Sequence, residues 1–103
     1  MKHFFKQIGF SAFQEFHNSQ SFFAYYQESN LDLVVYYDKE RGFISLKVTC
    51  NQISKEILPP VNIHDVQELK ELLLKLCYLK NFLPKLYSKI EQYHLPKFQP
   101  QVS

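Results

Sequence analysis

The sequence predicts an α+β fold, in which an antiparallel sheet of three strands, or of four, packs against a long C-terminal helix kinked by a proline. Three observations lead to this prediction. Residues 21–50 form apolar segments separated by short polar turns, residues 62–95 carry leucines at helical spacing, and residues 2–17 are rich in Phe. A chain of 103 residues is long enough for one domain, so we expect a single domain over residues 1–103.

Residues 2–17 are compatible with two structures. On one continuous helix the apolar side chains share a face, although Gly9 in its middle weakens a helix by about 1 kcal/mol relative to alanine. Alternatively, a short helix reaches Ile8 and a strand follows over residues 10–17. Both structures leave a Phe-rich surface that needs burial. The helical face consists of Phe4, Phe5, Ile8, Ala12 and Phe16, with Phe13 at its edge.

A β-meander is predicted for residues 21–50, with strands at 21–27, 31–37 and 43–50 and turns at 28–30 and 38–42. Neighbouring strand residues point to opposite faces, so each aromatic doublet in these strands places one ring on each face of the sheet. With tight turns, one face carries Phe22, Ala24, Tyr26, Val34, Tyr36, Ile44, Leu46 and Val48. The opposite face carries Phe23, Tyr25, Leu33, Val35, Tyr37, Phe43, Ser45, Lys47 and Thr49, and a slip of one residue would exchange such sets.

A connector and a long helix are predicted for the second half of the chain. Pro59-Pro60 interrupts both helix and strand, so residues 51–61 are interpreted as a connector. Asn62 is the predicted N-cap of a helix over residues 62–95, and Pro84 is expected to kink this helix, because the leucine stripe continues in phase beyond it. Residues 96–103 are expected to form an extended tail. The stripe comprises Leu69, Leu72, Leu73, Leu76, Leu79, Leu83, Leu86, Tyr87 and Ile90.

The residue types that usually carry catalysis or cofactors do not form recognisable motifs. Gly9 and Gly42 stand alone, so no glycine-rich phosphate loop can be built. Cys50 and Cys77 form no CxxC pair and are expected to be structural thiols. We therefore expect no enzyme, no catalytic residues, no cofactor and no metal. The four histidines, His3, His17, His64 and His94, are not at metal-ligand spacing on one helix face.

Charge and hydropathy indicate a soluble cytoplasmic protein that has no membrane partner. The longest strongly apolar run, 33–37, is far below the roughly 20 residues that span a bilayer, and the first ten residues lack the apolar stretch of a signal peptide. The net charge is only +2, which does not by itself indicate a nucleic-acid partner. The abundance of Lys, Phe, Tyr and Gln beside two Gly suits an A+T-rich coding genome, which favours a bacterial or phage source.

Two surfaces are candidates for intermolecular contact. On the back of the predicted long helix, Leu74, Tyr78 and Phe82 recur every four residues and form a ridge, with Lys75, Lys85 and Lys89 beside it. On the second face of the predicted sheet, aromatic rings lie near two cations. These residues are Phe23, Tyr25, Tyr37, Phe43, Lys47 and Arg41. The segment 2–17 can cover only one of the two surfaces, so an apolar surface is expected to remain exposed.

The sequence therefore favours a small non-enzymatic protein–protein interaction module. Such a module would act as an adaptor, regulator or inhibitor of a larger complex, and we expect it to associate with another protein or with a second copy of itself as a homodimer. The alternative is a nucleic-acid-binding module, in which bases stack on the aromatic sheet face and lysines contact phosphates.

Overall fold

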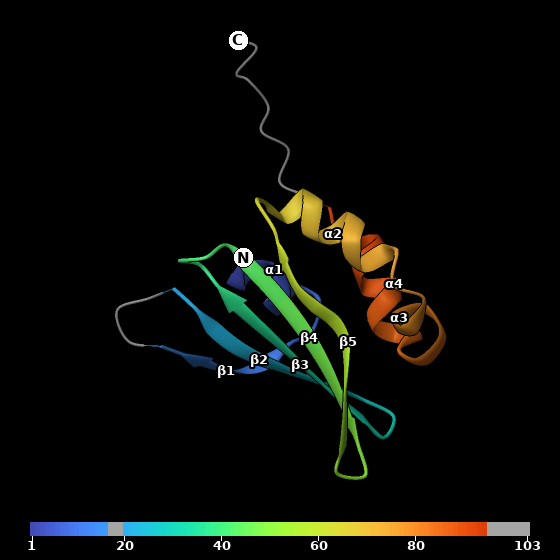
Figure 1. Cartoon of the computed structure of the whole chain (residues 1–103). Coiled ribbons are helices and arrows are strands. Elements are labelled where there is room, and N and C mark those ends of the chain that lie inside the picture. The colour runs from blue at the N-terminus through green and yellow to red at the C-terminus, as the bar shows by residue number, and fades with distance from the viewer. Residues whose placement is uncertain (17–19, 95–103) are drawn as a thin grey trace.

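A computed structural model of the chain describes residues 1–16 and 20–94 and shows a five-stranded antiparallel sheet with four helices (Figure 1). The predicted α+β class is confirmed, whereas the predicted strand number is too low. The strands follow one another across the sheet in chain order, as in a meander. The elements are α1 Lys2–Gln7, β1 Ser11–Glu15, β2 Phe22–Glu28, β3 Leu31–Asp38, β4 Phe43–Cys50, β5 Ile53–Asn62, α2 Val66–Leu74, α3 Cys77–Phe82 and α4 Pro84–Gln92.

The N-terminal segment forms a short helix followed by a strand, the second of the two structures compatible with its sequence. Gly9 lies between α1 and β1 with φ +107°, a backbone conformation that L side chains rarely adopt. A Cβ at this position would approach the Lys89 Nζ to 3.0 Å, so glycine also allows the close packing of α4 here. Phe4 and Phe5 of α1 are buried, which satisfies the predicted need to cover a Phe-rich surface.

The fifth strand occupies most of the segment that was interpreted as a connector, so that interpretation is wrong. Cys50 pairs with Ile53, and the two-residue turn between them has positive φ at both Asn51 and Gln52. Such a turn matches the twist of a β-hairpin, but here it contains no glycine that would reveal it in the sequence. Pro59-Pro60 is tolerated because β5 is an edge strand, where ladder donors are needed on one side only, and because the register shifts beside these prolines.

The side chains predicted to face the core are wrong for β3 and correct for β2 and β4. Glu28 pairs directly with Leu31, so the first turn contains two residues instead of the predicted three. This difference exchanges the two faces of β3, and Leu33 and Val35 become core residues. Asp38 pairs with Phe43, so the second turn is also one residue shorter than predicted, which brings β4 back into the expected orientation.

All four helices contribute to one core on a single face of the sheet in the described part of the chain. The Phe5 ring of α1 lies 6.0 Å from the ring of Phe22 in β2. The Phe4 ring lies 4.8 Å from that of Tyr93, which follows α4, so α1 and α4 are neighbours. In Figure 1, α1 lies behind the strands, and the face of the sheet toward the viewer carries no helix. The sheet residues of this core are Phe22, Ala24, Tyr26, Leu33, Val35, Ile44, Leu46, Val48 and Leu58.

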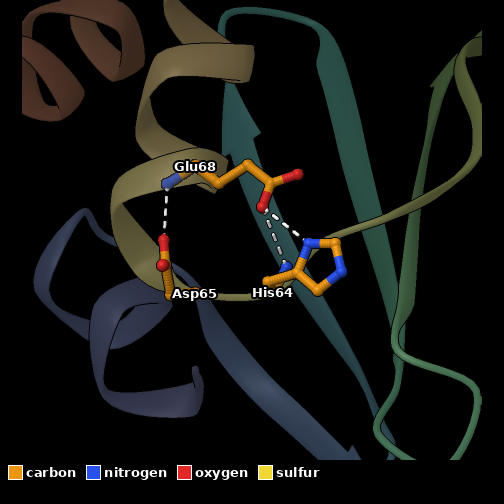
Figure 2. A network of polar contacts seen from close by, with 3 residues as sticks. All are labelled: His64, Asp65 and Glu68. Carbon is orange, nitrogen blue, oxygen red and sulfur yellow. Dashed lines mark hydrogen bonds and ion pairs between the residues drawn. The ribbon is translucent and has the colours of Figure 1, made fainter.

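The helix α2 begins at a capping box and not at the predicted N-cap. The Asp65 carboxylate accepts a hydrogen bond from the Glu68 backbone N–H at 2.8 Å, and the Glu68 carboxylate accepts one from the His64 backbone N–H at 3.2 Å (Figure 2). The first hydrogen bond satisfies an N–H group that a helix leaves without a partner at its start, and the second, from the residue before the N-cap, is a variant of the reciprocal bond of a capping box. Asn62, the predicted N-cap, is instead the last residue of β5.

The predicted long helix is divided into α2, α3 and α4, so a single kinked helix is not formed. Pro84 is the first residue of α4, a position where the missing N–H has no consequence. The Tyr87 hydroxyl donates to the Leu74 carbonyl at 2.9 Å, and the Lys70 Nζ donates to the Tyr93 carbonyl at 2.6 Å. These two contacts show that α4 runs back along α2. None of these helices is long and apolar enough to cross a membrane, a finding that covers the described residues. The predicted tail at 96–103 lies outside the described residues.

One buried carboxylate joins the sheet to α4. Glu28, the last residue of β2, accepts hydrogen bonds from the backbone N–H groups of Lys85 and Leu86, each at 3.0 Å. It also accepts one from the Tyr26 hydroxyl at 2.6 Å. Burial raises the pKa of this carboxyl, but the hydrogen bonds and the nearby Lys85 charge together lower it by more. The pKa of Glu28 therefore lies below its ordinary value. Glu28 therefore caps α4 from another element of the fold.

Candidate functional site

The face of the sheet opposite the helices, which we call the open face, carries apolar side chains without a covering layer in the described part of the chain. Phe23, Tyr36 and Phe43 point to this face and do not belong to the core cluster. They are only partly buried, and Tyr25 beside them keeps 37% of its surface exposed. Antiparallel sheets often expose one face, but that face is then polar, so an aromatic open face is unusual.

Four rings on this face form a continuous row across the sheet. The ring of Phe23 lies 5.5 Å from that of Phe16 and 4.8 Å from that of Tyr36. The Tyr36 ring in turn lies 5.8 Å from that of Phe43. The rings come from β2, β3 and β4 and from the residue after β1, so the row runs across the strands. We call Phe16, Phe23, Tyr36 and Phe43 the aromatic row.

Beside the aromatic row the open face is hollowed. A depression of about 230 Å³ is lined by Phe23, Val34, Tyr36, Ser45 and Lys47. Val34 also lines a second depression of about 390 Å³, which extends along the sheet to Asp32, so the two adjoin. The first depression is smaller than the roughly 300 Å³ at which small-molecule pockets begin, and the second is near the lower end of their range.

Charges of both signs surround the aromatic row. Lys47 lies opposite Glu56 across the β4–β5 pair, and Asp32 lies at the far end of β3. At the other end, the Asp38 carboxylate accepts a hydrogen bond from the Arg41 backbone N–H at 3.0 Å, which fixes the turn after β3. The pKa of Tyr36 is raised, first by burial and then by Asp38, while Arg41 acts in the opposite direction. The open face is therefore apolar at its centre and mixed in charge around it.

Four of the predicted sheet-face residues lie together on the open face: Phe23, Tyr25, Phe43 and Lys47. Arg41 lies in the turn at its end, as expected. Tyr37 does not belong there, because it pairs with Phe22 and Ile44 and points to the helix-covered face. Tyr36 takes its place, and the cause is the register difference in β3. Phe16 was also not predicted to lie on this face. If residues 10–17 are treated as a strand, Phe16 points to the same face as Gln14, because the two are two positions apart.

The predicted helix ridge is not continuous. Leu74 is the last residue of α2, whereas Tyr78 and Phe82 belong to α3. The rings of Tyr78 and Phe82 lie 4.7 Å apart, and Phe82 keeps 55% of its surface exposed. Tyr78 is half-buried against the core, so the exposed part of this α3 aromatic pair is Phe82.

The lysines predicted to flank this ridge are dispersed by the breaks between the helices. Lys75 follows α2 as its C-cap residue, and Lys85 and Lys89 belong to α4. The Lys89 Nζ lies 5.5 Å from the centre of the Tyr26 ring, on the side of α4 that faces the sheet. The structure therefore does not gather the three lysines beside Tyr78 and Phe82.

A larger depression, of about 470 Å³, lies elsewhere, between the start of α1 and the ends of β1 and β3. Its two lysines already have partners, because Lys2 forms an ion pair with Glu15 and Lys39 donates a hydrogen bond to Gln20. Within residues 1–16 and 20–94, no three His, Cys, Asp or Glu side chains are grouped so that they could hold a metal ion.

The chain matches no protein-family model, no curated protein and no solved structure. The open face and its aromatic row are therefore interpreted from their own geometry. Among the described residues, this face combines a row of contacting, partly exposed rings with adjoining depressions.

Proposed function

We propose that this chain is a small protein-binding module, an adaptor, regulator or inhibitor of a larger complex, which acts by binding and not by catalysis. The aromatic row on the uncovered sheet face is the observation that supports this proposal. Phe, Tyr and Arg are enriched at the centres of protein interfaces, where rigid rings lose little conformational entropy on binding. Cys50 and Cys77 are free thiols, which supports the cytoplasm as the proposed location.

The edges of the sheet favour binding through the face instead of strand addition. The edge strand β1 is short, and its register shifts near Ala12, whose φ is +53°. The other edge strand, β5, contains Pro59-Pro60 and two register shifts. Prolines, bulges and short length are the features by which sheets prevent pairing with another strand. A partner therefore finds its apolar contact area on the open face.

A pull-down with matched variants tests this function. We expect wild type and Phe82→Glu to recover the same protein at fixed stoichiometry from nuclease-treated lysate, whereas Phe23→Glu recovers none. Phe23 lies in the aromatic row, so a carboxylate there would be desolvated by any partner that covers the row. Circular dichroism of each variant checks that the fold is retained. If Phe82→Glu loses the protein and Phe23→Glu keeps it, the binding site is the α3 aromatic pair and the proposal is wrong.

A nucleic-acid-binding function is the second candidate, because rings in a row beside Lys47 and Arg41 can stack bases and contact phosphates. The carboxylates of Asp32, Asp38 and Glu56 on or beside the same face oppose a polyanion, which is why we rank it second. We expect single-stranded oligonucleotides to show no binding at low salt by fluorescence anisotropy. Binding that weakens steeply with salt and is abolished by Phe23→Glu would reverse the ranking.

A further inference from the structure

We propose that the occupant of the open face is a second copy of this chain, packed face to face with its strands antiparallel to those of the first. This inference rests on the proposed function, because it assumes that the aromatic row is the contact surface. The charges around the row and the strand register support it, and the dimensions of the face are compatible with it.

The mixed charge of the open face suits a copy of itself. A face that binds a positively charged partner is expected to be negatively charged, and the reverse, so that the two electrostatic potentials are complementary. Here two cations, Lys47 and Arg41, accompany three carboxylates, Asp32, Asp38 and Glu56, so the face carries charges of both signs. A two-fold symmetric interface needs a surface that complements itself, so cations of one copy must meet carboxylates of the other. Glu56 lies opposite Lys47 within the same chain, and the contacts between copies concern the other four charges.

The register places these charges in a fixed order along the strands. Asp38 pairs with Phe43 at one end of β3 and β4, and Asp32 pairs with Thr49 at the other end. Arg41 lies in the turn beyond Asp38. Lys47 pairs with Val34, between the aromatic row and Asp32. Along the strands the order is therefore Arg41, then Asp38 level with Phe43, then Phe23 level with Tyr36, then Lys47 and finally Asp32.

Two orientations of the symmetry axis are possible for sheets packed face to face, because the axis must lie in the plane between them. An axis parallel to the strands would place Asp32 opposite Asp32 and Arg41 opposite Arg41, which is repulsive in both cases. An axis across the strands, at the level of Phe23 and Tyr36, reverses the order in the second copy. Asp32 then meets Arg41, and Lys47 meets Asp38, each contact occurring twice. The charges thus select the antiparallel arrangement, with the rings of the two rows in contact.

The open face is smaller in plan than one side of a standard interface, so we expect a dimer of moderate affinity. Five strands at their usual spacing and about eight residues of strand length give a face of about 20 Å by 25 Å. The relief of rings and long side chains raises its accessible area above this plan area, toward the roughly 800 Å² per partner of a standard interface. Face-to-face sheets also pack at about 10 Å with their strands within about 30° of each other, which keeps the opposed charges close.

Charge reversal tests the arrangement, measured by sedimentation equilibrium of the full chain. We expect wild type to dimerise, and Asp32→Arg or Arg41→Asp alone to weaken the dimer about tenfold, because each creates two like-charge contacts. The double variant D32R/R41D should restore the wild-type dissociation constant. Lys80→Glu, an exposed charge reversal on α3, serves as the control and should leave the dimer unchanged.

Each other outcome overturns a defined part of the proposal. A double variant that dimerises no better than the single variants contradicts the antiparallel arrangement. If the wild type stays monomeric from micromolar to millimolar concentration, the occupant of the open face is not a second copy. The proposed function is then still supported if wild type recovers a different protein in the pull-down and Phe23→Glu does not. A wild-type dimer that Phe23→Glu leaves intact contradicts both the dimer interface and the use of the aromatic row.

Discussion

Replacing Glu28 by alanine is expected to lower the free energy of unfolding by about 3 kcal/mol, a large fraction of the stability of a domain of this size. The substitution would leave the backbone N–H groups of Lys85 and Leu86 and the Tyr26 hydroxyl without their acceptor. Glu28 is 7% exposed, so water reaches these groups poorly after truncation. Urea denaturation followed by circular dichroism measures the loss.

The neutral variant Glu28→Gln separates the charge from the shape of this side chain. Glutamine retains one carbonyl acceptor but presents an amide group to a helix N-terminus that favours negative charge. We expect a loss of about half that of Glu28→Ala. If Glu28→Ala unfolds at the same urea concentration as wild type, the carboxylate does not hold α4 to the sheet in solution.

The loss in free energy of unfolding caused by Glu28→Gln should depend on pH. Glu28 has a folded pKa below its ordinary value, so its ionised form stabilises the fold, and this contribution is complete above the unfolded pKa of about 4.3. The contribution is lost as the pH falls through the folded pKa. The difference in stability between wild type and Glu28→Gln should therefore be largest near neutral pH and should narrow in acid. A difference that stays constant between pH 7 and pH 3 would contradict this assignment.

Burial was predicted from the sequence more accurately than the bounds of helices and strands. Most of the leucine stripe of 62–95 is buried, including Leu69, Leu79 and Ile90. The breaks between α2, α3 and α4 preserve that burial, so hydrophobic spacing alone could not reveal them. The capping box at Asp65 and Glu68 was present in the sequence, but the assumption of a connector up to residue 61 moved the predicted start to Asn62.

The candidate site shows why register is difficult to derive from one sequence. Tyr36 and Tyr37 are equally hydrophobic, so hydrophobicity cannot show which of the two rings faces the core. The length of the preceding turn decides this. Glu28 was assigned to that turn because Glu, Ser and Asn favour turns, and its partners at Lys85 and Leu86 lie 57 and 58 residues further along the chain. No local pattern identifies a carboxylate that caps a distant helix.

The doublet Phe22-Phe23 gives a matched pair of variants in one strand. Phe22→Ala should lower the free energy of unfolding by about 4 kcal/mol, because this ring is 2% exposed and contacts the rings of Phe5 and Tyr37 in the core. Phe23→Ala should cost about 1 kcal/mol, since the ring is only partly buried and its ring contacts are those within the aromatic row. Urea denaturation of both variants measures the two costs under identical conditions.

The same pair separates folding from binding. Under conditions where both variants remain folded, Phe23→Ala should weaken association, whereas Phe22→Ala should retain it, because only the Phe23 ring reaches the open face. Tyr36→Phe and Tyr37→Phe provide the conservative controls, since each keeps its ring and loses only a hydroxyl. Equal destabilisation by Phe22→Ala and Phe23→Ala would mean that both faces of the sheet are covered in solution. In a monomer that result would contradict an open face, and in a dimer it would measure how much of the stability comes from the second copy.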